Sequence, residues 1–227
     1  MTFHIEHSDR MDPRTSPEIN IFKDASRGNW AAVFSALDSQ ALDPNLVSSP
    51  ENLGSPGGET LLSIAAAASN PDACRELIDR GANPALRTGH SNRPPIVEAV
   101  RCRGGKIARL NEVVKLLAST VNDRDSSGKT ALMFASVGAG LFGAKRGNIG
   151  LIKLLLDIGA DPFISDNHGT TALMHAVLSN KKSNVGANDE VISLLKETMI
   201  SFTAKQFFEK HCSYEFLPTG KLEVKPR

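Results

Sequence analysis

Apolar residues recur along the middle of this chain in short clusters whose spacing fits one face of a helix. The four clearest clusters are Cys74, Leu77 and Ile78; Val113, Val114, Leu116 and Leu117; Leu151, Ile152, Leu154 and Leu155; and Val191, Ile192, Leu194 and Leu195. Spacings of one, three and four residues collect such side chains on a single buried stripe of a helix. A segment rich in small residues precedes these clusters, so the pattern predicts pairs of helices in which the second helix is the more apolar.

The segments before the clusters share an opening. Gly58–Ala65, Gly128–Ala135 and Gly169–Ala176 read GETLLSIA, GKTALMFA and GTTALMHA, and a weaker copy, NRPPIVEA, spans Asn92–Ala99. The anchor residues at positions 60, 94, 130 and 171 lie 34, 36 and 41 residues apart. A motif that returns at a nearly constant spacing predicts a repeat array, in which each unit packs on its neighbours and the units form one elongated body.

This opening and spacing resemble the ankyrin repeat, whose units begin with a Thr-Pro-Leu-His-x-Ala type of motif at a period of roughly 33 residues. The resemblance covers about residues 18–197 and is specific in the second, fourth and fifth units. It implies an all-α solenoid of about five units, each a β-turn finger followed by two antiparallel helices, at 18–46, 57–85, 91–122, 125–162 and 166–197. The third unit departs from the pattern, because Pro94 and Pro95 replace Thr-Pro and Val121 stands where a Gly-Ala turn belongs.

The ends of the helices carry their own signals. Asn70, Asn111, Asn148 and Asn188 are predicted N-caps, and Asn70 precedes a proline suited to the first helical position. Gly81 and Gly159 follow two of the Leu-rich clusters, where a glycine can adopt the left-handed conformation that ends a helix.

The turns between paired helices are predicted to differ in length. From the opening residue to the first apolar pair of the next helix, the second unit takes 13 residues (60 to 73). The following units take 19 (94 to 113), 21 (130 to 151) and 20 (171 to 191). The six, eight and seven extra residues are assigned to the inter-helix turns. Insertions in a stacked array project from one face, often the binding face.

The charges of these turns have one sign. The segments 101–110, 137–147 and 178–187 contain eight basic residues and no Asp or Glu: Arg101, Arg103, Lys106, Arg109, Lys145, Arg146, Lys181 and Lys182. Neighbouring units spaced by roughly 10 Å would hold these turns within about one Debye length of each other. We therefore expect a basic rim that steers an acidic partner, against the alternative that scattered surface charges only keep the chain in solution.

The overall composition adds few constraints. The 26 Lys and Arg residues balance 25 Asp and Glu residues, so net charge favours neither nucleic acid nor a membrane surface. Three widely spaced cysteines form no disulfide framework or zinc motif, and no apolar run is long enough to span a membrane. A cytoplasmic, monomeric protein is expected. Residues 1–17 are predicted to be a flexible leader and 198–227 a capping or docking extension, with a helix over Ser201–His211 and a hairpin that turns at Pro218–Gly220.

No catalytic motif stands out, and neither a metal nor a cofactor is expected. His4, His7, Asp9 and Asp12 would at best hold a metal weakly on the leader. His175 is interpreted as a packing residue of the fifth unit, Cys74 as a small core residue, and Cys102 as a thiol whose neighbouring arginines would lower its pKa if it were exposed.

The resemblance implies non-catalytic binding of another protein through a concave groove. Finger-tip residues would contact the partner, among them Glu59, His90, Arg93, Lys129, Asn167 and His168. An immunity-type inhibitor of a toxin or enzyme, or a secreted effector acting on a host protein, remains open as a narrower role. Nucleic-acid binding is disfavoured, since aromatic residues that would stack on the bases of a single strand are scarce near the basic residues.

Overall fold

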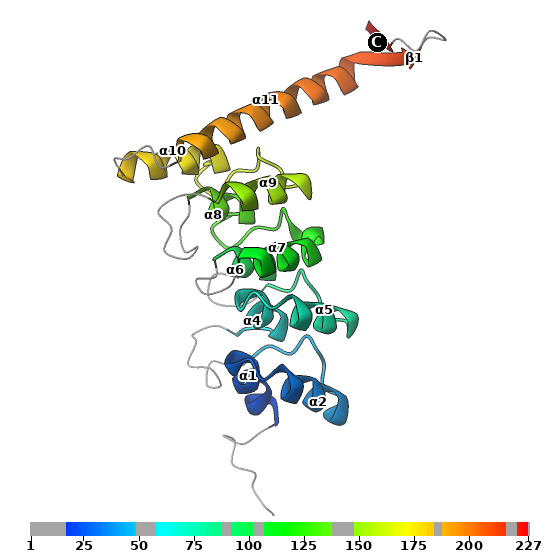
Figure 1. The fold of residues 1–227 in the computed structure, drawn as a ribbon, viewed down its shortest axis with the longest axis vertical. Helices are drawn as coiled ribbons and strands as arrows, with labels where there is room; N and C mark the ends of the chain where they lie inside the picture. The colour runs from blue at the N-terminus through cyan, green and yellow to red at the C-terminus, as the bar shows by residue number, and fades with distance from the viewer. Residues whose placement is uncertain are drawn as a thin grey trace, which may run out of the picture.

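A computed structural model describes residues 17–48, 58–87, 92–101, 107–137, 148–183, 188–216 and 222–226. Over these residues the helices form consecutive antiparallel pairs (Figure 1). The pairs are α1 Pro17–Arg27 with α2 Trp30–Gln40, α4 Leu61–Ala67 with α5 Pro71–Asp79, α6 Pro95–Arg101 with α7 Ile107–Leu116, α8 Ala131–Val137 with α9 Ile149–Asp157, and α10 Ala172–Ser183 with α11 Asp189–His211. The predicted solenoid of about five helical units is thereby confirmed.

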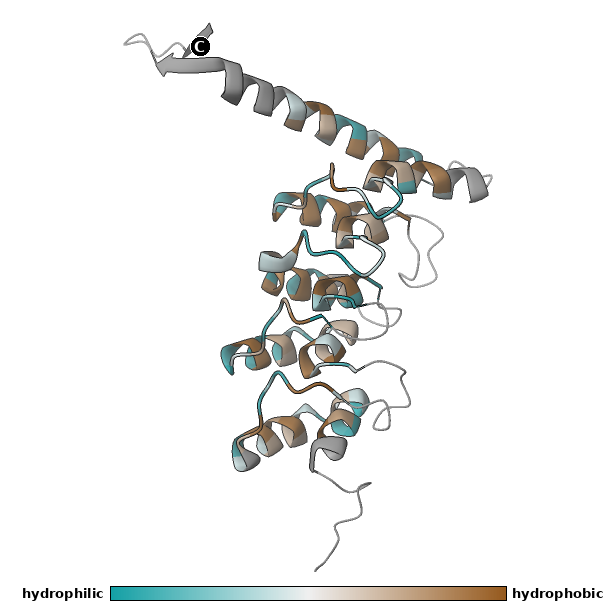
Figure 2. Ribbon diagram, turned by 180° about the vertical axis from the view of Figure 1, so that it is seen from behind, coloured by the Kyte–Doolittle hydropathy of each residue, from teal (hydrophilic) through white to brown (hydrophobic). Residues whose placement is uncertain are grey.

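The pairs stack in two columns. The first helices α1, α4, α6 and α8 lie above one another in one column and the second helices α2, α5, α7 and α9 in the other (Figure 1). Hydrophobic residues, brown in Figure 2, occur in the helices of both columns, and the buried ones belong to one core cluster. Among the described residues, the largest fully buried side chains come from the first four pairs and include Phe22, Leu62, Leu77, Ile96, Leu132 and Leu151, while Ala172, Ala176, Val191 and Leu195 of the fifth pair join the same core. One continuous core therefore runs along the array.

Several helix ends follow the predicted chemistry. The side-chain oxygens of Asn70 and Asn148 accept hydrogen bonds from the backbone N–H groups of Ala73 and Leu151, at 3.3 and 3.0 Å. Gly81 and Gly159 adopt φ values of +92° and +96°, in the left-handed region that a C-cap requires. The predicted N-cap at Asn111 is wrong, because α7 already begins at Ile107 and the extra residues of this unit lengthen the helix.

Asparagine side chains join consecutive units across the turns after the second helices. The Asn45 amide donates to the carbonyl of Gly81 at 3.1 Å and accepts from the Asn83 N–H at 2.7 Å. Asn122 repeats this arrangement two units later, donating to the Gly159 carbonyl at 3.0 Å and accepting from the Asp161 N–H at 2.8 Å. These pairs of bonds satisfy backbone groups at helix ends that would otherwise lack partners.

The inter-helix turns differ from the prediction in two of the three long units. Residues 107–110 belong to α7 and residues 178–183 to α10, so the extra length there is partly helical. A continuing helix satisfies backbone groups that a long turn would leave to solvent. Residues 138–147 of the fourth unit, and 102–106 and 184–187, lie outside the described residues.

The C-terminal segment is a continuation of the last repeat. The helix expected over Ser201–His211 is part of α11, which runs uninterrupted for 23 residues at an oblique angle to the stack (Figure 1). The predicted hairpin is present: β1 Cys212–Phe216 pairs antiparallel with β2 Leu222–Pro226, with Phe216 opposite Leu222. The ring of Phe202 on α11 lies 5.7 Å from that of Phe163, which precedes α10. Within the described residues, no helix is long and apolar enough to cross a lipid bilayer.

Candidate functional site

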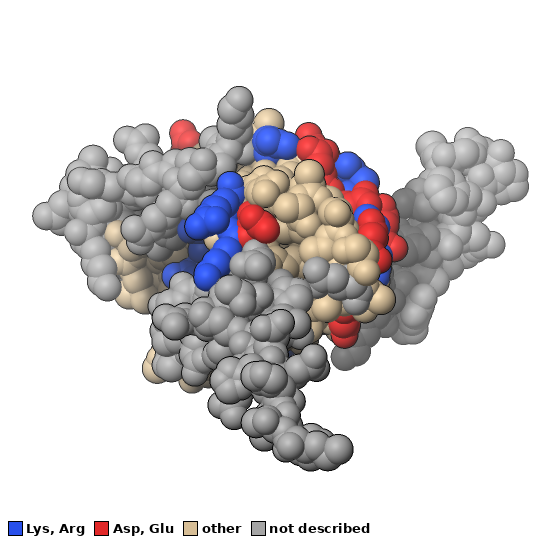
Figure 3. Space-filling model, turned by 90° about the horizontal axis from the view of Figure 1, so that it is seen from below, with Lys and Arg blue, Asp and Glu red and all other residues tan. Residues whose placement is uncertain are grey.

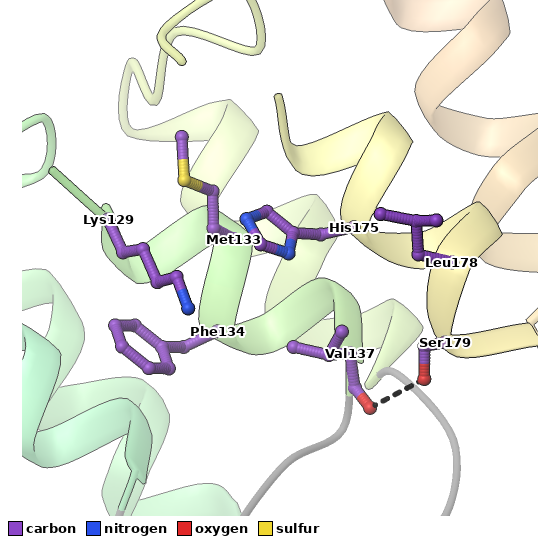
Figure 4. A pocket seen from close by; sticks show the side chains of 7 residues that line it. All are labelled: Lys129, Met133, Phe134, Val137, His175, Leu178 and Ser179. Atoms are coloured by element: carbon purple, nitrogen blue, oxygen red, sulfur yellow. Dashed lines mark hydrogen bonds between the residues drawn. The ribbon is translucent and has the colours of Figure 1, made fainter. Parts of the chain in front are cut away.

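A hollow of about 440 Å³ opens between the first helices of the fourth and fifth units. Its walls come from the finger turn before α8, from α8 itself and from α10 (Figure 4). The lining side chains are Lys129, Met133, Phe134, Val137, His175, Leu178 and Ser179. Most of this surface is apolar, and Lys129 supplies a positive charge at its edge. We call this feature the α8/α10 pocket.

The finger turn that carries Lys129 is fixed by one carboxylate. Asp125 is buried, and its Oδ1 accepts hydrogen bonds from the N–H groups of Ser127 and Lys129, both at 2.9 Å. Gly128 between them has φ +79°, and a Cβ there would collide with atoms of Arg124 and Asn167. The turn therefore requires glycine at this position, and it delivers the Lys129 side chain to the pocket.

The next finger repeats this arrangement and adds a histidine. Asp166 accepts hydrogen bonds from the N–H groups of His168 and Thr170 at 2.9 and 3.0 Å. The second oxygen of Asp166 lies 2.8 Å from Nε2 of His175 on α10. The His175 side chain is itself largely buried. His175 therefore connects the fifth finger to α10 and also lines the pocket, which extends the packing role expected from the sequence.

These contacts keep Asp166 ionised. Burial alone raises the pKa of its carboxyl, but hydrogen bonds from the Thr170 and His168 backbone and the interaction with His175 outweigh that effect. The net pKa is about 2, below the ordinary value of 3.8. The carboxylate is thus a permanent part of the finger, and it holds the His175 ring against the pocket wall.

A charged network adjoins the pocket on the side of the second and third units. Glu98 on α6 pairs with Arg93 at 2.9 Å and with Arg101 at 3.7 Å, and the Arg101 guanidinium lies 5.5 Å from the ring centroid of Phe134. Burial raises the pKa of Glu59, and the charge of Glu98 raises it further. These residues and the pocket form one connected surface along the first helices, which we call the inner face.

The expected basic rim is partly compensated by carboxylates. Arg101 pairs with Glu98, and Arg109 lies 2.9 Å from Asp72 on the preceding unit. Arg103, Lys106, Lys145 and Arg146 lie outside the described residues, while Lys181 and Lys182 belong to α10 by their backbone. Seen from below, a group of Lys and Arg side chains lies beside one carboxylate, and the opposite edge carries both signs together (Figure 3). The two rim arginines whose side chains the structure describes, Arg101 and Arg109, thus each have a carboxylate partner.

The finger-tip residues divide into two groups. Asn167 donates to the Ser126 carbonyl at 2.9 Å, and its backbone N–H donates to Ser127 at 3.0 Å, so it joins adjacent fingers. His168 is exposed, as expected of a contact residue, and His90 lies outside the described residues. Lys129 and Arg93 reach the inner face, where Arg93 is already paired with Glu98.

Nothing in the described residues assembles a metal site from three or more His, Cys, Asp or Glu side chains. The leader residues His4, His7, Asp9 and Asp12, and Cys102, lie outside the described part of the chain. Cys74 is buried in the core, and burial raises the pKa of its thiol to about 12. Its thiol is therefore uncharged and packs as a small apolar group.

Lys129, expected at a finger tip, lies at the edge of the α8/α10 pocket, whose apolar members were not among the expected contact residues. Met133 and Phe134 belong to the conserved-looking opening motif of the fourth unit, where they read as core residues. Leu178 and Ser179 fell in a segment interpreted as a turn, whereas α10 extends through them. The sequence did contain one signal for Leu178. If the helix after Thr171 continues to position 178, Leu178 lies on the same face as Met174, four residues earlier, and His175, three residues earlier.

Comparison with known proteins supports the repeat assignment. The family model described as the ankyrin repeat matches residues 57–89 and 127–167. The chain is 35% identical over 75 residues to the regulatory protein SWI6 and 36% identical over 86 residues to protein HOS4, both of Saccharomyces cerevisiae. These matches cover 33% and 37% of this chain, but only 8% and 7% of the respective relatives. The chain thus matches only a small part of these much longer proteins.

Proposed function

Because this chain is an ankyrin-repeat protein, we propose that it is a non-catalytic module that binds a partner protein through the inner face, centred on the α8/α10 pocket. Ankyrin repeats bind other proteins, and the stacked units present the first helices and finger turns side by side.

The observation that carries the proposal is the exposed apolar surface at the pocket. Leu178 is 50% exposed and lines the hollow together with the half-buried side chains of Phe134 and Val137. Protein interfaces bury a central patch of this kind, in which a few side chains dominate the binding energy. The first helices of the second and third units offer far less apolar area, because nearly all their side chains are buried within the array.

Site-specific photocrosslinking tests this assignment. In one variant, a benzophenone amino acid replaces Leu178. In the matched control it replaces Lys153, which is exposed on α9 and lies outside the pocket. Both full-length proteins are produced in their native cells and irradiated. We expect a discrete crosslinked partner from position 178 and none, or much less, from position 153. Equal crosslinking from both positions, or crosslinking from position 153 alone, would contradict the proposal.

A further inference from the structure

We propose that the α8/α10 pocket receives one large apolar side chain from an acidic segment of the partner, with a neighbouring carboxylate of that segment paired to Lys129. This inference rests on the proposed function and specifies the chemistry of what the pocket binds.

The shape and lining of the pocket suit a single anchoring side chain. Its volume of about 440 Å³ lies within the usual range for a ligand pocket, and the pocket is partly open to solvent. Val137 at the end of α8 and Leu178 on α10 line one end of the hollow, and Phe134 projects from α8 beside Lys129 at the other end (Figure 4). An apolar side chain inserted there would remove the exposed Leu178 from water and gain contacts on both walls.

The two walls are held in place without a partner. The Ser179 hydroxyl donates to the Val137 carbonyl at 3.5 Å, which links α10 to the end of α8. The contact of His175 with Asp166 links α10 to its own finger at 2.8 Å. A pocket whose walls are already fixed loses less conformational freedom on binding, so it favours a defined anchor over a diffuse apolar contact.

The charges around the pocket favour a carboxylate beside the anchor. Asp125 and Asp166 are buried, and they accept hydrogen bonds from the backbone of their own fingers. Glu98 is engaged by Arg93 and Arg101. Within the described residues, Lys129 has no ion-pair partner within 4.0 Å, although it lines the pocket. The charge at the apolar walls that has no ion-pair partner among the described residues is therefore positive, so an acidic group placed there gains an attraction and a basic group does not.

Nuclear magnetic resonance with short peptides tests this directly on the full chain. The protein is labelled with ¹³C at Leu and Val methyl groups and titrated with N-acetyl-Glu-Phe-Glu-amide. We expect the Val137 and Leu178 methyl signals to shift with saturation, because both side chains line the pocket, while the buried Leu77 methyls of the second unit stay unchanged. The peptides N-acetyl-Lys-Phe-Lys-amide and N-acetyl-Glu-Ala-Glu-amide separate the two requirements, and both should bind more weakly.

Two charge reversals complete the test. Lys129→Glu should lower the affinity for the acidic peptide by about three- to tenfold. Lys153→Glu changes the net charge by the same amount but lies outside the pocket, so it should leave the affinity for this peptide unchanged. Leu178→Ala should also weaken binding when Val137 is the reporter. Methyl signals that do not move, that move equally with the lysine peptide, or that respond equally to both reversals would overturn the inference. Crosslinking of a partner from position 178 alongside such a result would leave the proposed function intact and remove only this chemistry.

Discussion

The first helices of the second and fifth units share one sequence motif but differ in how much of it they bury. In α4, the six residues Leu61 to Ala66 are all buried. In α10, among the side chains the structure describes, Ala172 and Ala176 are buried, while Met174 and Leu178 are 52% and 50% exposed. α4 packs against neighbouring first helices on both sides, whereas α10 packs on α8 alone in that column. The comparison indicates that the first helix of the second unit buries its apolar residues within the array, whereas α10 leaves part of its apolar surface exposed.

The sharpest test of this comparison is a matched pair of leucine truncations. Leu61→Ala should lower the free energy of unfolding by about 2–5 kcal/mol, because it removes buried methyl groups and leaves a cavity. Leu178→Ala should change it by about 0.5 kcal/mol or less, because half of that side chain is already in water. Urea denaturation measures both. A loss at Leu178 as large as the loss at Leu61 would show that α10 is part of the stabilising core.

The fifth unit compensates for its smaller apolar burial with a stronger polar anchor. Asp166 accepts two backbone N–H groups and contacts His175, whereas the Ser48 hydroxyl in the corresponding finger of the second unit accepts one, from Glu59, among the residues that the structure describes. Asp166→Ala should therefore cost about 1–3 kcal/mol and Ser48→Ala about 0.5–1.5 kcal/mol, again measured by urea denaturation. Equal costs would mean that His175 adds nothing to the anchor.

The same anchor predicts how stability depends on pH. The pKa of Asp166 is lowered on folding to about 2, so its charged form stabilises the folded state. That contribution is fully present above the ordinary pKa of 3.8 and is lost as the pH falls toward 2. The stability difference between the wild type and Asp166→Asn should therefore shrink as the pH falls through this window. A difference that stays constant from pH 5 to pH 2 would argue against the ionised carboxylate as its source.

A smaller effect is expected at the joints between units. Asn122→Ala removes one side-chain donor and one acceptor that connect the third unit to the fourth, and should lower stability by roughly 1 kcal/mol. Asn45→Ala should have a similar effect at the joint between the first and second units. If neither change is detectable by denaturation, water replaces these exposed bonds and apolar stacking alone aligns the units.

The smallest structural effect belongs to the long turns. The double reversal Lys145→Glu with Arg146→Glu should leave stability unchanged, slow association with a crosslinked partner and reduce the dependence of the association rate on salt. Stopped-flow binding at two ionic strengths measures this. An unchanged association rate would remove the basic rim from the account without affecting the α8/α10 pocket, whose charge comes from Lys129.

The sequence predicted the repeated features of the fold and missed those that depend on context. Asn70, Asn148, Gly81 and Gly159 were identifiable because capping is local chemistry set by a few neighbouring residues. The Asn111 cap failed because α7 begins four residues earlier, and the sequence does not say whether extra residues extend a helix or a turn. The continuity of α11 was equally hidden, since its residues after Glu197 follow no repeat that marks a boundary.

The candidate site shows the same division. Lys129 was predicted at the inner face because the finger position is part of the repeated motif. The pocket itself depends on Leu178 and Phe134, which belong to different units and meet only through stacking. The exposed fraction of Leu178 depends on how α10 packs on α8, and no local pattern in the sequence reports it.

The central claim is that the partner binds at the α8/α10 pocket and not along the protruding α11. Leu178→Glu and Ile200→Glu make the same chemical change at two exposed apolar positions, 50% and 70% exposed, one in the pocket and one on α11. The affinity of each full-length variant for the crosslinked partner is measured by titration calorimetry. We predict that Leu178→Glu weakens binding at least about tenfold and that Ile200→Glu leaves it unchanged. The reverse result, with binding lost only in Ile200→Glu, would contradict the account.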